Sequence, residues 1–287
     1  MSDLRIQHFY HQLTGTLSYV VSDSDSRKAA IIDPVLGFSV VSGRTDRGPA
    51  RQLLDYLAEH RLELEWILET HAHADHLSAA QLIKREAGGV VGIGEGIRSV
   101  QQHFQGVFNL KPPFRPDGSQ FDRLFAEGDA FMLGSIECRV LSTPGHTSDS
   151  ITYVIGDAAF VGDSLFMPDF GTARCDFPGG DAALLYDSIQ KLFSLPAGTR
   201  LFMCHDYPPE TRGLRYEVTI EEQQQANIHV GGGKSRDEFV RMRTERDATL
   251  NLPALILPSI QVNIRAGLLP EPEDNKVSYV KIPLDLL

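Results

Sequence analysis

The amino-acid sequence predicts a layered α/β fold with its functional groups in loops at the ends of strands. Short runs rich in Val, Ile and aromatic residues alternate with stretches in which leucines recur at helical spacing. In addition, a dense group of His and Asp residues directly follows one of the strand-like runs, at residues 71–76. Loops positioned by a rigid scaffold carry function more often than the elements they connect. We therefore expect the active groups at one edge of a sheet.

The first part of the chain predicts strands and two helices. Residues 17–21 and 29–32 are strand-like and are separated by a polar turn. From about residue 49 to residue 60, Leu53, Leu54 and Leu57 form a helical stripe. Residues 66–69 predict a strand, residues 77–87 a helix that ends at two glycines, and residues 90–93 a further strand. Residues 104–121 hold three prolines and predict a long loop or insertion.

The second part predicts hairpin-like segments followed by helices. Residues 131–141 and 151–161 are apolar and hairpin-like, and residues 200–204 predict another strand. Asp181 can cap a helix whose apolar face holds Leu185, Ile189, Leu192 and Phe193. Two capping boxes, Thr219 with Glu222 and Ser235 with Glu238, predict helix starts in the tail. Residues 278–282 are again strand-like.

Composition excludes several classes of protein. A chain of 287 residues with 42% hydrophobic residues has ample core for one large domain or two small ones. The net charge of −11 argues against nucleic acid as a partner. A helix needs about 20 apolar residues to cross a bilayer, and no apolar run in the chain approaches that length. The start of the chain lacks a secretory signal, and Cys138, Cys175 and Cys204 are too scattered for a disulfide framework. We therefore expect a cytoplasmic protein without a membrane segment.

A metal-ligating motif stands directly after the strand predicted at residues 66–69. It contains His71, His73, Asp75 and His76. Imidazole and carboxylate groups are the usual ligands of zinc and of non-haem iron. A single histidine is usually a surface or packing residue, but four such groups at this spacing favour a metal site.

Three further residues of the same kind follow short apolar runs. His146 comes after Pro144-Gly145, Asp163 after Gly162, and His205 after Cys204. Ligands of one metal usually come from several loops, so these residues are candidates for the same site. The other histidines stand in no such context and are interpreted as surface or packing residues: His8, His11, His60, His103 and His229.

The ordered pattern His-x-His-x-Asp-His, Pro-Gly-His-Thr, Gly-Asp and a final His resembles the metallo-β-lactamase superfamily over about residues 15–207. The resemblance implies an αββα sandwich with the metal site at one edge of the two sheets. We expect a catalytic domain at residues 1–210 and a C-terminal extension at residues 211–287 that packs on the same domain.

Two branches of that superfamily compete. In glyoxalase II, a glutathione thioester hydrolase with two metals, all seven matched positions hold metal, which implies two zinc ions here. In persulfide dioxygenases, also called sulfur dioxygenases, one Fe(II) is held by the matches of His71, His146 and Asp163. The remaining four are then outer-shell residues: His73, Asp75, His76 and His205.

The residues after Asp163 favour the dioxygenase branch. Arg174, Asp176 and Phe177 form an Arg-x-Asp-Phe element that resembles persulfide dioxygenases and is absent from glyoxalase II. Residues 227–233 and the later Leu252-Pro253 resemble the bacterial members of that branch. The chain departs from the pattern in a longer loop at residues 107–121 and in Cys175, where many relatives carry Thr.

The resemblance implies a reaction that also suits the ligand set. Two His and one carboxylate form the facial triad of non-haem Fe(II) oxygenases, which leaves positions open for a thiolate and for dioxygen. The expected reaction oxidises the sulfane sulfur of glutathione persulfide with O2 to sulfite and glutathione. Arg174, Asp176 and Tyr207 are candidate substrate-binding residues, because Arg binds a carboxylate with a bidentate fork. Alternatively, Arg174 pairs with Asp176 to hold the loop. The resemblance also allows a homodimer.

Overall fold

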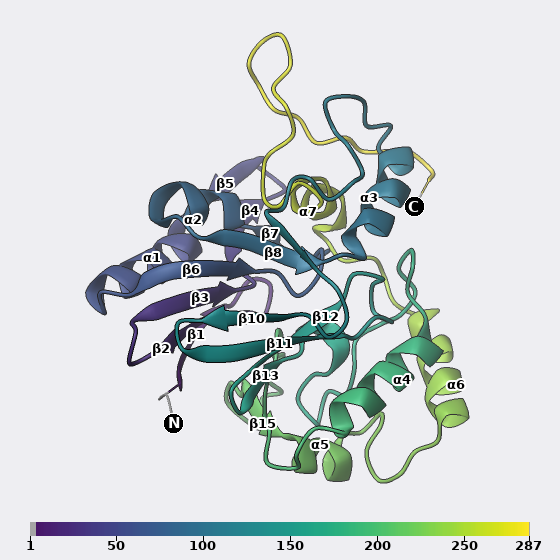
Figure 1. Ribbon diagram of the computed structural model, residues 1–287. Helices are drawn as coiled ribbons and strands as arrows, with labels where there is room; N and C mark the ends of the chain where they lie inside the picture. The colour runs from purple at the N-terminus through teal and green to yellow at the C-terminus, as the bar shows by residue number, and fades with distance from the viewer. Residues whose placement is uncertain (1–3, 287) are drawn as a thin grey trace.

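The computed structural model describes residues 4–286 and consists of two mixed sheets packed face to face, with helices on their outer faces (Figure 1). The first sheet has the strand order β1(Leu4–His11), β2(Thr16–Asp23), β3(Lys28–Ile32), β6(Glu63–Leu68), β8(Val90–Gly94), β9(Arg123–Phe125). Its β1, β2 and β3 pair antiparallel, whereas β3, β6, β8 and β9 pair parallel.

The second sheet is antiparallel except where β13 meets β14. Its order is β10(Ala130–Leu133), β11(Ile136–Ser142), β12(Ile151–Ile155), β13(Ala158–Phe160), β14(Arg200–Phe202), β15(Glu217–Thr219). A small third sheet joins β5(Arg44–Asp46), β4(Val35–Ser39) and β7(Leu77–Ser78). The helices are α1(Gly48–Glu59), α2(Ala80–Ala87), α3(Ile97–Val107), α4(Ala182–Phe193), α5(Ile220–Ala226), α6(Arg236–Asp247) and α7(Ile256–Asn263).

Three apolar layers hold the sandwich together. The central layer lies between the sheets and includes Leu17, Tyr19 and Tyr153. The phenol groups in this layer find partners, because the Tyr19 hydroxyl donates to the Met203 carbonyl and the Tyr153 hydroxyl to the Glu69 carbonyl. The outer layers bury the apolar stripes of α1, α2 and α3 on one side and of α4, α5 and α6 on the other. The predicted αββα sandwich is therefore confirmed.

Local sequence signals explain several helix starts. The Asp181 side chain accepts a hydrogen bond from the backbone N–H of Leu184 and begins α4, as predicted. Ser235 and Glu238 form the predicted capping box of α6. Thr219 caps α5 by accepting from the N–H of Glu222, but the Glu222 carboxylate pairs with Arg215.

Three expectations about elements are wrong, two of them in part and the third entirely. Residues 77–78 form the short strand β7, so α2 begins only at Ala80. The predicted loop 104–121 begins with the last turn of α3, whose Phe104 packs into the apolar layer. Residues 278–282 form no strand, because the backbone of Lys281 bonds to the Gln261 side chain rather than to a neighbouring strand.

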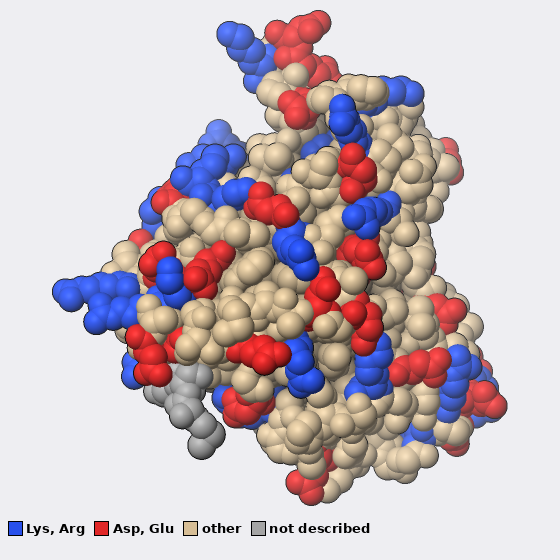
Figure 2. All heavy atoms as spheres, in the orientation of Figure 1, with Lys and Arg blue, Asp and Glu red and all other residues tan. Residues whose placement is uncertain are grey.

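In the view shown, no face of the surface carries charges of only one sign. Lys and Arg side chains are interspersed with Asp and Glu across it (Figure 2). Within residues 4–286, no helix is both long and apolar enough to cross a bilayer. The division of the chain at residue 210 stays a prediction.

Candidate metal centre

The predicted ligands come from four separate loops that the two sheets bring together. The first loop follows β6, and the others follow β11, β13 and β14. Backbone hydrogen bonds tie these loops to one another: the N–H of Ile151 donates to the Thr70 carbonyl at 2.9 Å. Thr16, at the start of β2, pairs with His205 in an isolated bridge. Residues separated by more than a hundred positions therefore share one edge of the sandwich.

Three side chains form a compact donor set. The ligand atoms of His71, His146 and Asp163 all lie within 4.8 Å of one another, and all three residues are buried. Asp163 Oδ2 lies 3.9 Å from His71 Nε2 and 3.5 Å from His146 Nε2. Ligand atoms held about 2.0–2.2 Å from one ion at tetrahedral angles lie about 3.3–3.6 Å apart, so a small inward shift of His71 brings all three atoms into range of one ion.

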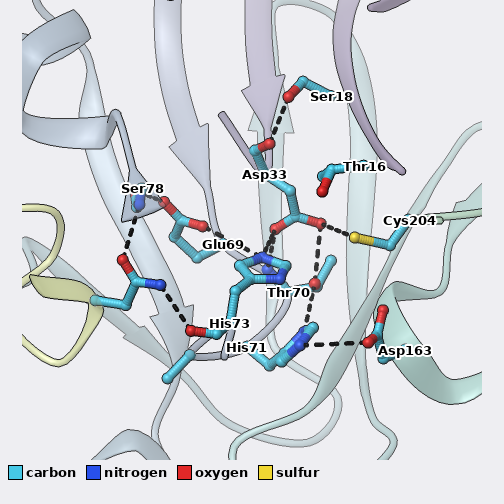
Figure 3. A network of polar contacts seen from close by, with 12 residues as sticks. Thr16, Ser18, Asp33, Glu69, Thr70, His71, His73, Ser78, Asp163 and Cys204 are labelled. Atoms are coloured by element: carbon cyan, nitrogen blue, oxygen red, sulfur yellow. Dashed lines mark hydrogen bonds and ion pairs between the residues drawn. The ribbon is translucent and has the colours of Figure 1, made fainter. Parts of the chain in front are cut away.

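The His71 ring is oriented by a chain of hydrogen bonds that begins at Asp33 (Figure 3). The Thr70 hydroxyl donates its one proton to Asp33 Oδ2 at 2.9 Å. Towards His71 Nδ1, which lies 3.0 Å away, it can therefore act only as an acceptor. The Thr70 N–H also donates to Asp33 Oδ1 at 2.7 Å. His71 therefore carries its proton on Nδ1 and directs the Nε2 lone pair at Asp163, the tautomer that a metal ligand needs.

His146 has the same tautomer for a different reason. Its Nδ1 donates to the carbonyl oxygen of Arg174 at 2.7 Å, which leaves the Nε2 lone pair free.

Burial, and then the neighbouring His73, lower the pKa of His71 well below its ordinary value. His71 is therefore neutral, and a neutral imidazole is the form that ligates metal.

The four remaining motif residues lie beside this set. His73 Nε2 is 3.0 Å from Asp33 Oδ1, His76 Nδ1 is 3.2 Å from Asp75 Oδ2, and His205 Nε2 is 3.5 Å from both Asp75 and Asp163. Among the described residues, buried ring nitrogens without a hydrogen-bond partner include His71 Nε2, His73 Nδ1, His76 Nε2 and His205 Nε2. An unpaired buried polar atom costs about 1–3 kcal/mol, so the cluster is built to hold metal. His73 groups with Asp75 and His76 rather than with His71 and His146.

A residue of α7 fixes the metal-binding loop. Asn263, at the end of α7, donates from Nδ2 to the carbonyls of His73 and His76, both at 2.8 Å. Its Oδ1 accepts from the N–H of Ser78 at 2.8 Å. Asn263 and Asp33 were not predicted as site residues, since neither stands in a recognisable motif and α7 itself was not expected.

A pocket of about 250 Å³ opens onto the metal cluster. Its metal-side wall includes His146, Asp163 and His205. Its other walls are mainly aromatic and basic, with Phe166, Phe170, Phe177, Tyr207, Arg174, Arg243 and Arg246. Two of the three predicted substrate-binding residues, Arg174 and Tyr207, thus line the pocket. Tyr207 stacks on His205, with ring centroids 5.6 Å apart.

The arginines of the pocket differ in how far their charge is already compensated. Arg174 forms a fork with Asp176, with two bonds of 2.6 Å, and donates to the Asn251 carbonyl. Arg243 bonds to Asp247 and to the Thr172 carbonyl. Within residues 4–286, the Arg246 guanidinium has no carboxylate within ion-pair distance. The geometry therefore favours the loop-holding interpretation of Arg174 and leaves Arg246 for an anionic ligand.

Replacing Arg174 and Arg246 separately should give different phenotypes. We expect Arg174→Ala to lower the free energy of unfolding by about 1–2 kcal/mol, because Asp176 and the Asn251 carbonyl lose a charged donor. We expect Arg246→Ala to leave stability nearly unchanged and to raise the KM for a carboxylate-bearing substrate. Denaturant unfolding and steady-state kinetics measure the two effects; an unchanged KM in Arg246→Ala contradicts this assignment.

The fold and the site together define a metal-dependent enzyme built on an αββα sandwich. Residues 12–205 match the family model described as the metallo-beta-lactamase superfamily. The chain belongs to the metallo-beta-lactamase superfamily, and its His/Asp cluster is the metal-binding site of that fold. The resemblance predicted from the sequence is confirmed.

Two of the relatives are about half identical to the chain in sequence, and a third is 30% identical. The chain is 51% identical over 294 residues to "Probable metallo-hydrolase" of Burkholderia pseudomallei (strain 1710b), covering 99% of this chain and 100% of that protein. It is 49% identical to "Glyoxylase B2" of Dictyostelium discoideum, with 99% and 98% covered. It is 30% identical to "Persulfide dioxygenase ETHE1, mitochondrial" of Bos taurus, with 92% and 89% covered.

A solved structure agrees with the third relative. The crystal structure of ETHE1 from Myxococcus xanthus superposes with a TM-score of 0.74 at 30% sequence identity. The match covers 92% of this chain and 100% of that chain. The similarity therefore extends past His205 into the residues that follow the metal-binding loops.

Proposed function

We propose that this enzyme is a persulfide dioxygenase that oxidises the sulfane sulfur of glutathione persulfide with O2, using one Fe(II) per chain. The observation that carries the proposal is the compact donor set of His71, His146 and Asp163, with both imidazoles oriented through Nδ1. The likeness to persulfide dioxygenase and to ETHE1 over most of the chain supports it.

The reaction balances without a further reductant. Glutathione persulfide, O2 and water give glutathione, sulfite and protons. The S–S bond breaks, dioxygen supplies two of the oxygen atoms of sulfite and water supplies the third. The sulfane sulfur is oxidised by four electrons, and these four electrons reduce one O2. The protein must therefore bind the persulfide, admit O2 and release protons.

The donor set fits Fe(II). Two imidazoles and one carboxylate form the facial triad typical of non-haem Fe(II) oxygenases, which keeps positions open for a sulfur ligand and for dioxygen. The residues of the chain do the rest. The Nδ1–H groups of His71 and His146 donate to the Thr70 hydroxyl and the Arg174 carbonyl, and these bonds hold the two rings in their ligating tautomers. The aromatic wall of the pocket limits the access of water to the reacting sulfur.

The pocket also suits the glutathione moiety. Glutathione carries two carboxylates, and Arg246 lines the pocket with no carboxylate of residues 4–286 within ion-pair distance. A guanidinium binds a carboxylate with two parallel hydrogen bonds, which fixes orientation as well as affinity. We propose that Arg246 takes over the substrate-binding role first predicted for Arg174, and that Asp176 serves only to hold Arg174. The homodimer and the cytoplasmic location stay predictions.

A second function is favoured by one specific observation. His73, His76 and His205 also present unpaired buried ring nitrogens, and Asp163 lies between His71 on one side and His205 on the other. This arrangement could hold a second metal, as in a binuclear zinc hydrolase of glutathione thioesters. The names "Probable metallo-hydrolase" and "Glyoxylase B2" of two relatives also favour this alternative.

Oxygen consumption with glutathione persulfide distinguishes the two functions. Protein loaded anaerobically with Fe(II) should consume O2 and form sulfite in equal amounts, whereas protein loaded with zinc should consume none. The same preparations should be assayed for cleavage of a glutathione thioester. Thioester cleavage by the zinc form, with no oxygen consumption by the iron form, contradicts the proposal and favours the hydrolase.

A further inference from the structure

A row of hydroxyl groups connects the metal centre with a second, separate pocket. The Thr16 hydroxyl donates to Asp75 Oδ2 at 3.3 Å and lies 3.4 Å from His76 Nδ1. The Thr14 and Thr16 hydroxyls are 2.7 Å apart, and His11 Nδ1 is 2.8 Å from the Thr14 hydroxyl. Thr16 is fully buried, whereas Thr14 and His11 are half-buried. The row therefore runs from the interior towards the surface.

The turn between β1 and β2 places these groups. His11 ends β1, Thr16 begins β2, and the two are register partners in the first sheet. Gly15, at φ 66°, lies against Tyr207, and a Cβ at this position would be 2.6 Å from that ring. Only glycine fits this close approach and this backbone conformation without strain. The position of the row is thus fixed by the same turn whose Gly15 packs against Tyr207, a residue of the substrate pocket.

The two ends of the row open into different spaces. Asp75 lines the pocket proposed for the substrate. His11 lines a separate pocket with Tyr10, Asp46 and Gln52. When substrate fills the first pocket, water can no longer carry protons out through it. A path through the turn would remain open, because it does not pass through the substrate.

We propose that Thr16, Thr14 and His11 conduct protons from the metal centre to solvent during turnover. The proposal rests on the proposed function only in that the reaction releases protons, which hydrolysis of a thioester also does. For transfer, the Thr16 hydroxyl turns from Asp75 towards Thr14. It then accepts a proton from the side of the metal centre, and its own proton passes to Thr14. The proton of Thr14 then passes to His11 Nδ1, and the resulting imidazolium releases its Nε2 proton to solvent. Only O–H and N–H bonds form and break. Afterwards the two hydroxyls rotate back, and the imidazole regains its Nε2–H tautomer by proton exchange with solvent.

The surroundings of His11 suit an acceptor of protons. Burial lowers the pKa of His11, and His76 lowers it further, whereas Asp46 of β5 and Asp75 of the metal-binding loop raise it. The net shift is downward, so the ring is neutral at neutral pH and can accept a proton on Nδ1. Histidine is the side chain best suited to this exchange near neutral pH.

Replacing His11, at the outer end of the row, should slow turnover without disturbing the metal centre. For His11→Ala we expect kcat to fall about tenfold in dilute buffer, with KM and bound metal unchanged. Added imidazole should restore kcat, because it supplies the missing acceptor. His103→Ala, at an exposed position, is the control and should behave like the unmodified protein.

The pair Thr14→Val and Thr14→Ser tests the row itself. Thr14→Val keeps the shape but loses the hydroxyl, so it should lower kcat as His11→Ala does, whereas Thr14→Ser should retain kcat. The whole series is measured as oxygen consumption and as thioester cleavage. If the unmodified protein only cleaves thioester, the proposed function fails. The kcat values of the variants for thioester cleavage then test the proton path. An unchanged kcat in both His11→Ala and Thr14→Val, or no rescue by imidazole, overturns the proton path.

Discussion

Replacing His146 with Ala should remove the bound metal and abolish activity, whereas replacing His205 should leave one metal per chain. His146 supplies one of the three donors that lie together, and its Nδ1 is already engaged with the Arg174 carbonyl. Without it, two ligands remain for an ion that needs at least three from the protein. His205 lies 3.5 Å from Asp163 but belongs to a different group of donors.

Metal analysis and activity on the same samples measure this difference. We expect His146→Ala to contain no stoichiometric iron and to lose activity by at least about three orders of magnitude. His205→Ala should retain its iron and part of its activity. His60→Ala, at an exposed position, is the matched control. Equal loss of metal in His146→Ala and His205→Ala would show that the ligand set extends beyond the triad and would favour the binuclear hydrolase.

Replacing Asp33 with Ala should destabilise the protein and weaken metal binding together. Asp33 accepts from Thr70, through both its N–H and its hydroxyl, and from His73 Nε2. It is buried, so its loss leaves these donors without partners and frees the His71 ring to turn (Figure 3). We expect a loss of about 3–5 kcal/mol in the free energy of unfolding and about 10–100-fold weaker metal binding.

Denaturant unfolding of the metal-free protein separates the two effects, because it removes the contribution of the metal to stability. Asp33→Asn, which keeps the size and one acceptor, should be intermediate. Asp55→Ala, on the exposed face of α1, is the control and should change little. If Asp33→Ala unfolds like the control and binds metal normally, Asp33 does not orient the site.

The metal cluster could be predicted because its signal is local. His71, His73, Asp75 and His76 stand close together in the sequence, directly after an apolar run, and the later candidates follow the same rule. The helix caps at Asp181 and Ser235 could be predicted for a similar reason, since a cap contacts only its own first turn. The helices α4 and α6 begin where these caps predict.

Residues that act over a long distance could not be predicted. Asn263 contacts the carbonyls of His73 and His76, which lie 190 and 187 residues earlier in the chain, and a single Asn in an unrecognised helix carries no signal. His11 was interpreted as a surface or packing residue because its role depends on a turn that places it beside Thr14. Conversely, the apolar residues at 278–282 suggested a strand, but the segment has no partner strand and stays outside the sheets.

Oxygen consumption during a titration with Fe(II) tests the central claim most directly. Metal-free protein is titrated anaerobically with Fe(II), and each sample is mixed with glutathione persulfide and O2. If His71, His146 and Asp163 hold one catalytic iron, the rate should rise linearly and level off at one equivalent per chain. A break at two equivalents, or no oxygen consumption at any loading while zinc-loaded protein cleaves a thioester, contradicts a mononuclear dioxygenase.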